Sequence, residues 1–183
     1  MLKIVPNYKI GVIGTGFVGS AVSAGLQSIL GNDVDIREHD KYKNSESLES
    51  VISNSNITFL CLPTPMAEDG SCDLSIIESV LQEISDITDK RKLLVIKSTV
   101  PPGATFKFQE KYKKFDIIFN PEFLREARFI DDFIEQDRIF IGFPKNCNVK
   151  NVHSLNIFYQ HFLEKRKKSM KISIPVYGLE IPI

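Results

Sequence analysis

Side chains that could do chemistry gather in four short segments, and each segment directly follows an apolar run. The first has three glycines in the spacing GxGxxG, a pattern that lets the backbone approach a phosphate closely. The second and third each place a threonine beside prolines. The fourth holds two glutamates, which could act as general bases. These segments are residues 14–19, 61–65, 98–103 and 120–126.

The glycine segment lies between the apolar run 10–13, typical of a buried strand, and a stretch whose apolar residues repeat at helical spacing. At such a strand-to-helix turn, Gly14 would permit the tight turn, Gly16 would let the backbone approach a pyrophosphate, and Gly19 would let the helix pack on the strand. A glycine-rich turn without a ligand is the alternative. The candidate dinucleotide-binding residues are Gly14, Thr15, Gly16, Phe17, Val18 and Gly19.

A second strand, over residues 34–38, runs into acidic residues. A dinucleotide-binding domain needs a carboxylate about 20 residues beyond its glycines to accept hydrogen bonds from the adenosine ribose. Glu38 and Asp40 both have this spacing, and we favour Asp40 because it begins the exit from the strand. No arginine follows directly, which favours NAD over NADP. An exposed loop carboxylate is the alternative for either acid.

Strand and helix patterns alternate six times, which predicts a doubly wound α/β fold of Rossmann type with a parallel sheet and right-handed crossovers. The loops at Thr64, Thr99 and Asn120 should then face one crevice, although each alone is also an ordinary connector. We expect one domain, with the dinucleotide-binding part over residues 1–145 and a C-terminal helix and last strand over 146–183. The predicted strands are residues 10–13, 34–38, 56–62, 93–96, 115–119, 139–141 and 170–176, and the last helix is 149–163.

Composition excludes several classes of protein. Lys plus Arg and Asp plus Glu both total 23 in 183 residues, so the formal net charge is zero and we expect no nucleic-acid partner. No apolar run approaches the ~18 residues of a membrane helix, and the first residues lack a signal-peptide core, so we expect a cytoplasmic protein without membrane contact. Cys61, in an apolar run, and Cys72 and Cys147, in polar stretches, form no CxxC pair, so neither a disulfide framework nor a metal site is expected.

Residues 122–133 show helical spacing, with an apolar face that includes Phe123 and Phe133. In that helix Glu122 and Glu126 would share one face, and their mutual repulsion would raise the pKa of at least one of them toward that of a useful base. The alternative is an exposed acidic helix face without a catalytic role.

These motifs, in this order, resemble the amino-terminal domain of the UDP-glucose/GDP-mannose dehydrogenase family, the nucleotide-sugar 6-dehydrogenases. The resemblance covers residues 9–142, and its last two motifs are far more specific than the glycines. The motifs are Gly-Thr-Gly-Phe-Val-Gly at 14–19, Cys-Leu-Pro-Thr-Pro at 61–65 with residues 69–75 after it, Ser-Thr-Val-Pro-Pro-Gly at 98–103, and Asn-Pro-Glu-Phe-Leu-Arg-Glu at 120–126 leading to Asp-Arg-Ile at 137–139.

Members of this family oxidise the C6 alcohol of a UDP- or GDP-sugar to a carboxylate, so the resemblance implies NAD as cofactor and a nucleotide sugar as substrate. It assigns the pyrophosphate to the glycine turn and the ribose to Asp40. It places Thr64 and Thr99 near the nicotinamide, with Thr99 also able to touch the sugar. Glu122 corresponds to a glutamate that contacts substrate and serves as candidate base for thioester hydrolysis, and Glu126 to one nearer the cofactor.

The sequence also departs from the family's pattern. Complete members are much longer, and they continue into a helical linker and a second domain that carries the nucleophilic cysteine in a GGxC setting, for which we find no counterpart here. Without that thiol an aldehyde cannot be held for a second hydride transfer. We therefore expect NAD binding without turnover unless a second subunit supplies the cysteine domain. A homo-oligomer is also compatible with the sequence.

Three interpretations remain open at this point. The chain is the NAD-binding domain of a dehydrogenase that a partner completes, or it is a non-catalytic module that senses NAD(H) or regulates a full-length relative by joining its oligomer. A degenerate remnant is the third, and the intact motifs argue against it. Residues 175–183 are unlike the family, which fits a natural truncation, a frameshift or a split subunit.

Overall fold

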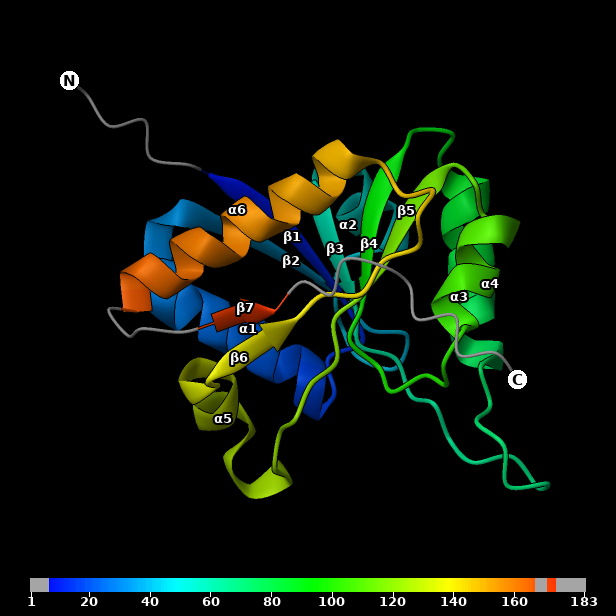
Figure 1. Cartoon of the computed structure of the whole chain (residues 1–183), viewed down its shortest axis with the longest axis horizontal. Helices are drawn as coiled ribbons and strands as arrows, with labels where there is room; N and C mark the ends of the chain where they lie inside the picture. The colour runs from blue at the N-terminus through cyan, green and yellow to red at the C-terminus, as the bar shows by residue number, and fades with distance from the viewer. Residues whose placement is uncertain (1–6, 167–170, 174–183) are drawn as a thin grey trace.

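The computed structural model describes residues 7–166 and 171–173. Its centre is a five-stranded parallel sheet in the order β2-β1-β3-β4-β5 (Figure 1). This order is doubly wound, and it reverses between β1 and β3, the position where open α/β sheets bind ligands. The predicted fold class is confirmed. The strands are β1 Tyr8–Ile13, β2 Val34–His39, β3 Ile57–Leu60, β4 Lys92–Ile96 and β5 Phe115–Phe119.

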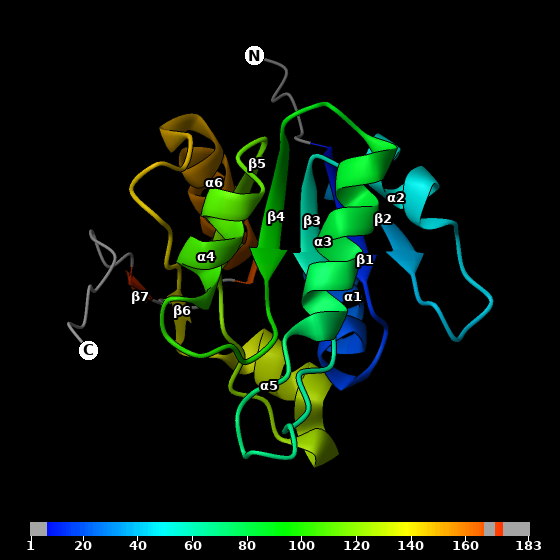
Figure 2. The same cartoon turned by 90° about the vertical axis from the view of Figure 1, so that its right-hand side faces the viewer.

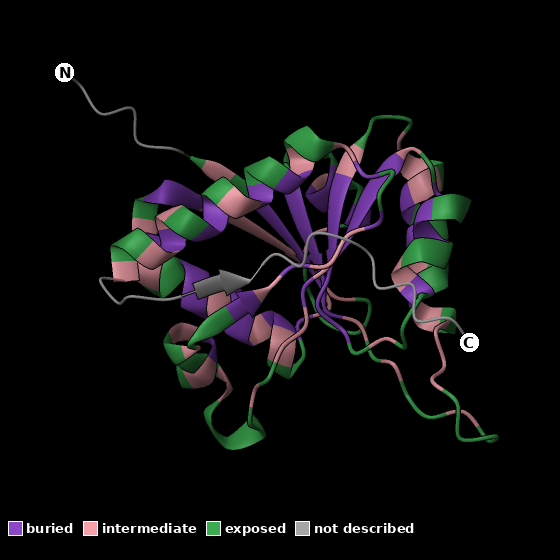
Figure 3. Cartoon of the chain, viewed as in Figure 1, coloured by how far each residue is buried: buried purple, intermediate pink, exposed green. Residues whose placement is uncertain are grey.

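Helices cover both faces of the sheet, which explains why its inner strands β3 and β4 are apolar on both sides (Figures 2 and 3). In β4, for example, Leu93 and Val95 pack in one core with α1, α5 and α6, whereas Leu94 and Ile96 pack in a second core with α2, α3 and α4. The helices are α1 Phe17–Leu30, α2 Leu48–Asn54, α3 Ser75–Ile87, α4 Ala104–Lys111, α5 Phe129–Glu135 and α6 Val149–Arg166, with short 3-10 turns at Gly31–Asp33 and Glu126–Arg128.

The sixth predicted strand does not join the main sheet. β6 (Arg138–Phe140) pairs instead with β7 (Lys171–Ser173) in a separate two-stranded parallel sheet. The reason lies at the end of β5, where Phe119 and Gly142 exchange backbone hydrogen bonds of 2.7 and 2.8 Å in an antiparallel bridge. The chain that returns after β6 therefore runs antiparallel to β5 at this point and does not extend the sheet as a sixth parallel strand. β7 confirms part of the predicted last strand, and the remainder of 170–176 lies outside the described residues.

The predicted helix over residues 122–133 is also wrong in its first half, because regular α-helix begins only at α5. The backbone N–H of Arg125 donates to Asp132 at 2.9 Å and its guanidinium binds the same carboxylate, which holds residue 125 in an extended conformation. Phe123 is 72% exposed, whereas Phe133 is buried as predicted. Phe133 fills the space over Gly25 of α1, where an added Cβ would lie 2.3 Å from its ring.

Two buried carboxylates fasten α6 to the rest of the fold. Asp116 of β5 accepts hydrogen bonds from the Asn148 backbone and the Asn151 side chain at the start of α6, at 2.7 and 2.6 Å. Asp33 accepts hydrogen bonds from His161 and Lys165 near its end, each at 2.8 Å. No helix in the described part of the chain is both long and apolar enough to cross a lipid bilayer.

Candidate functional site

The segments that carry the predicted site residues all lie at the carboxyl ends of the parallel strands. Backbone hydrogen bonds between neighbouring segments continue there, just past the end of each strand. The bonds are Gly14 N–H to His39 O at 2.8 Å, Cys61 N–H to Ile13 O at 2.8 Å, Lys97 N–H to Leu60 O at 2.9 Å and Asn120 N–H to Ile96 O at 2.9 Å. The four motifs of the sequence therefore meet at the carboxyl edge of the strands, as predicted from the topology.

The glycine turn has the geometry that a phosphate-binding turn requires. Gly14 has a φ of +87°, a conformation that favours glycine, and an added Cβ there would lie 2.4 Å from the carbonyl oxygen of Cys61. A Cβ on Gly19 would lie 1.9 Å from the carbonyl oxygen of Gly14, so this glycine lets α1 touch the turn. A Cβ on Gly16 would meet nothing within 4 Å, so this position is open to a ligand.

The start of α1 keeps its backbone N–H groups available. Gly16 is the N-cap, no side chain caps this end, and the first turn holds no acidic residue. The four unpaired N–H groups and the positive end of the helix dipole therefore favour an anion in front of Gly16. Phe17 is 55% exposed beside this opening and meets Phe129 edge to face at 5.7 Å, and Val18 is half-buried.

Asp40 lies at the end of β2 and is fastened to the glycine turn. One carboxylate oxygen accepts the Thr15 backbone N–H at 2.8 Å and the Thr15 hydroxyl at 2.9 Å, and the other accepts the Tyr42 N–H at 3.0 Å. These hydrogen bonds, that from the Thr15 backbone above all, lower the pKa of Asp40. Thr15 thus fixes the position of Asp40 beside the glycine turn. The Lys43 ammonium donates to the carbonyl oxygen of Thr15.

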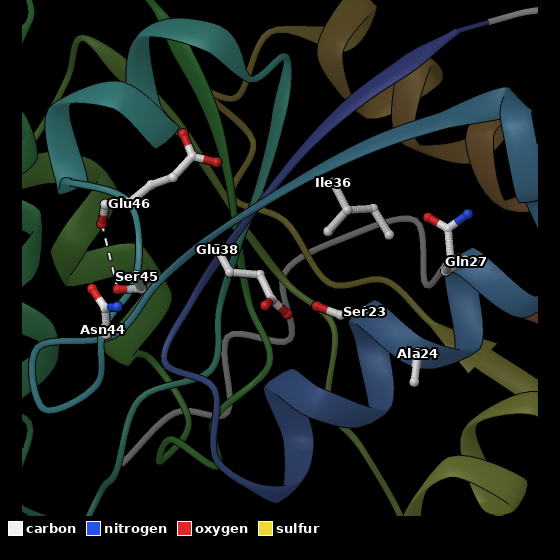
Figure 4. Close-up of a pocket in the computed structure, with 8 residues that line it drawn as sticks. All are labelled: Ser23, Ala24, Gln27, Ile36, Glu38, Asn44, Ser45 and Glu46. Carbon is white, nitrogen blue, oxygen red and sulfur yellow. Dashed lines mark hydrogen bonds between the residues drawn. The ribbon is translucent and has the colours of Figure 1, made fainter.

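Glu38, the alternative acid, lies elsewhere. It lines a groove of about 470 Å³ beside the edge strand β2, where it extends toward Ser23 of α1 (Figure 4). The glycine turn contributes no residue to this groove. The geometry therefore favours Asp40 over Glu38 as the acid beside a bound ribose.

The two threonine segments are held together by Ser98. The Ser98 hydroxyl accepts the N–H of Leu62 at 2.9 Å and donates to the Leu62 carbonyl at 2.6 Å, which ties the exit of β4 to the exit of β3. Thr99 is exposed, and Thr64 is half-buried. The Cys72 thiol approaches the Thr99 carbonyl at 3.9 Å, so the loop after Thr64 folds back onto the β4 exit.

The two glutamates have opposite environments, because they do not share a helix face. The Glu122 side chain is 5% exposed and forms an ion pair with Lys97, whose side chain is 2% exposed. Glu126 lies in the exposed 3-10 turn, and the neighbouring Arg125 binds Asp132. The expected carboxylate pair is therefore replaced by a buried lysine–glutamate pair.

Several residues of this site were not predicted. Lys97 and Ser98 follow the buried residues of β4 directly, and Tyr159 of α6 donates to the side chain of Asn120. The sequence signal for Lys97 was a single lysine at the end of an apolar run, and such a lysine is equally compatible with a side chain that points into solvent. The position of Tyr159 seven residues after Val152 also fits the buried stripe of α6.

Two of the three thiols among the described residues are not arranged for nucleophilic chemistry. Burial raises the pKa of Cys61 to about 12 and that of Cys147 to about 11, so both are protonated at neutral pH. Cys147 was expected in a polar loop but is buried, in contact with Gln109. Within residues 7–166 and 171–173, no three His, Cys, Asp or Glu side chains are grouped to hold a metal ion.

A doubly wound parallel sheet with an open glycine turn at its switch point defines a nucleotide-binding α/β protein. Residues 34–163 match the family model of the UDP-glucose/GDP-mannose dehydrogenase family, NAD binding domain. The chain belongs to this family, and NAD is its cofactor. The matched region begins after the glycine turn, so the evidence that the turn fits a dinucleotide is its own geometry.

Two curated proteins are similar to this chain in sequence. An uncharacterized protein of Methanocaldococcus jannaschii is 32% identical over 188 residues, which cover 86% of this chain and 21% of that protein. The UDP-glucose 6-dehydrogenase of Rickettsia bellii is 37% identical over 109 residues, covering 57% of this chain and 25% of that enzyme.

Among solved structures, a UDP-glucose dehydrogenase from Pyrobaculum islandicum has the same fold, with a TM-score of 0.76 at 23% identity over 95% of this chain and 47% of that one. The chain thus spans less than half of the length of each of these three relatives.

Proposed function

We propose that this chain is the NAD-binding part of a nucleotide-sugar 6-dehydrogenase, and that it takes part in oxidation of a sugar C6 alcohol to a carboxylate when the remaining part of the enzyme is supplied. The observation that carries the proposal is the open position of Gly16 in front of the uncapped start of α1. A dinucleotide pyrophosphate fits there, because the site offers unpaired N–H groups and no side chain competes for them.

The same edge supplies residues for the other parts of the cofactor and for substrate. Asp40, held by Thr15, would accept hydrogen bonds from the ribose, and Thr64 and Thr99 would lie along the nicotinamide half. Thr99 and Glu122 would face the sugar, and Glu126, which is exposed, would lie nearer the cofactor. NAD would accept the hydride, Thr64 and Thr99 would orient the reactants, and Glu122 would serve as the base that receives a proton.

Completion of the reaction requires a nucleophilic thiol. Oxidation of an alcohol to a carboxylate takes two hydride transfers, and a covalent thiohemiacetal would hold the aldehyde between them. Two of the three thiols are buried with raised pKa values. We therefore propose that the nucleophilic cysteine comes from a further segment or subunit, which would also cover Phe17, Met66 and Phe123, left exposed along or near the carboxyl edge.

The cofactor site is tested by Gly16→Ala, with NAD affinity measured by calorimetry. The φ of Gly16 is −71°, so alanine fits the backbone and the variant should keep its melting temperature. Its methyl group would occupy the approach to the pyrophosphate, and we expect NAD affinity to fall at least tenfold, about 1.4 kcal/mol. Gly142→Ala is the control, since its Cβ would meet nothing closer than 3.9 Å. Equal affinities for both variants would contradict the proposal.

The catalytic part is tested by mixing the chain with a separately expressed cysteine-containing segment of a relative and following NADH formation from UDP-glucose. A completed enzyme predicts turnover that neither component shows alone. A complex with a full-length relative that changes the relative's activity without new turnover would instead support the regulatory module.

A further inference from the structure

A cluster of buried polar side chains lies beneath the candidate site, between the end of β4 and the helices α5 and α6. The Lys97 ammonium donates to the side-chain oxygen of Asn120 at 2.7 Å and pairs with the Glu122 carboxylate. The Tyr159 hydroxyl donates to the same Asn120 oxygen. The Asn120 amide donates to the Phe140 carbonyl at 2.7 Å, which orients its oxygen toward Lys97.

The surroundings of Lys97 are mostly apolar. The rings of Phe59 and Phe133, both in the core that packs with α1, α5 and α6, each have their centroid 5.9 Å from its nitrogen. Burial in this environment lowers the pKa of Lys97 to about 7. An isolated ammonium would be costly here, and a carboxylate partner offsets that cost.

Among the described side chains near Lys97 that are named here, Glu122 is the one in a position to pass a proton to its amine. Cys61 and Tyr159 both have pKa values raised by burial, so they stay neutral. Asn120 has no titratable group. Glu122 is the remaining neighbour, and its carboxylate is in direct contact with the lysine.

We propose that Lys97 is the proton partner of Glu122. In this proposal the ammonium of Lys97 loses its proton to solvent when the positively charged nicotinamide binds, the neutral amine then takes up the proton that Glu122 removes from substrate, and the ammonium–carboxylate pair of the structure forms again. This inference rests on the proposed function, in which Glu122 serves as a base. The transfer is balanced, because the carboxylic acid and the amine become a carboxylate and an ammonium, and only one O–H and one N–H bond change. Lys97 is thus a positioning residue that acts through Glu122.

The chemistry explains why such a partner is useful. Each oxidation of an alcohol by NAD releases one proton, and a base that is 5% exposed has little water to receive it. A neutral amine in contact with the base can accept that proton. Asn120 and Tyr159 keep the amine in place, since the Asn120 oxygen accepts hydrogen bonds from both.

The test is a pH titration of lysine side chains by carbon and nitrogen NMR on the whole chain. We expect one lysine to titrate between about pH 6 and 9, far below the usual 10.4, and its signal to disappear in Lys97→Met. Lys92→Met is the matched control, because Lys92 begins the same strand and donates to the carbonyl of Ser55 at 3.1 Å. In Glu122→Gln the Lys97 midpoint should fall further. A Lys97 midpoint above pH 10, or one unchanged in Glu122→Gln, would overturn the inference.

Calorimetry separates this inference from the proposed function. NAD brings a positively charged nicotinamide toward Thr99, so wild type and Lys92→Met should release a fraction of a proton on binding at pH 7, and Lys97→Met should release none. Proton release that persists in Lys97→Met would count against Lys97. Absence of NAD binding in wild type would overturn the proposed function, while the NMR titration would still decide whether Lys97 and Glu122 share a proton.

Discussion

In the proposed cofactor site, Asp40 would combine two tasks that a neutral side chain could not perform together. Its one oxygen accepts both donors of Thr15, and its other oxygen accepts the N–H of Tyr42. A carboxylate has lone pairs left after these bonds, whereas an amide has a single acceptor oxygen. The charge of Asp40 therefore both fixes the glycine turn and leaves acceptor capacity for a ribose.

This arrangement predicts that Asp40→Asn binds NAD at least tenfold more weakly, because the amide cannot serve Thr15 and a ribose at once. Glu38→Gln should bind as wild type does, since Glu38 lies in the separate groove beside β2 (Figure 4). Isothermal titration with NAD measures both variants. A loss confined to Glu38→Gln would reverse the assignment of the two acids.

At the scale of single residues, the sequence was informative where function depends on local backbone. Gly14, Gly16 and Gly19 could be predicted because their spacing alone sets the turn. The Lys97–Glu122 pair could not, because these residues come from different strand exits and only the fold brings them together. Ion pairs of this kind leave no periodic pattern in a sequence.

Helices and strands were predictable where the spacing of apolar residues is compatible with a single secondary structure. Apart from the edge strand β2, the strands of the main sheet are short runs that are mostly buried on both faces, and their parallel order follows from alternation with helices. β6 was also predicted from an apolar run, but such a run does not indicate which sheet the strand joins. The antiparallel bridge between Phe119 and Gly142 keeps β6 out of the main parallel sheet. The stretch 122–125 has helical spacing, yet the Arg125–Asp132 contact holds it extended.

The attachment of α6 depends on Asp116, whose side chain is fully buried. Burial acts to raise the pKa of Asp116, but hydrogen bonds from Arg91, Asn148 and Asn151 outweigh it, so the pKa is lowered. A carboxylate with a lowered pKa stabilises the folded state above the pKa it has in the unfolded chain, and this contribution is lost as the pH falls through the folded value.

We therefore expect Asp116→Asn to lower the free energy of unfolding by about 1–3 kcal/mol at pH 7, an amount limited by the partial exposure of Arg91. The difference from wild type should shrink as the pH falls below about 4, where the wild-type carboxylate becomes protonated. Urea denaturation at several pH values measures this. Asp89→Asn, at an exposed carboxylate, is the control, and a difference that persists at low pH would contradict the assigned role of charge.

At the scale of the whole molecule, the two helix layers and the exit loops form one frame around the carboxyl edge. Core residues of α1, α5 and α6 pack against one face of the same strands whose other face packs α2, α3 and α4. A ligand that binds the strand exits contacts segments from both halves of the sheet. Binding should therefore stabilise the fold as a unit and not a single loop.

NAD at about a hundredfold excess over its dissociation constant should stabilise the chain by about 2.7 kcal/mol, because it binds the folded state alone. For a chain of 183 residues this corresponds to a rise in melting temperature of roughly 5–11 °C, measured by calorimetry. NADP at the same concentration should give a much smaller rise, since its additional phosphate would lie near the Asp40 carboxylate. Equal shifts would contradict the role of Asp40, and no shift with either nucleotide would contradict NAD binding by this chain alone.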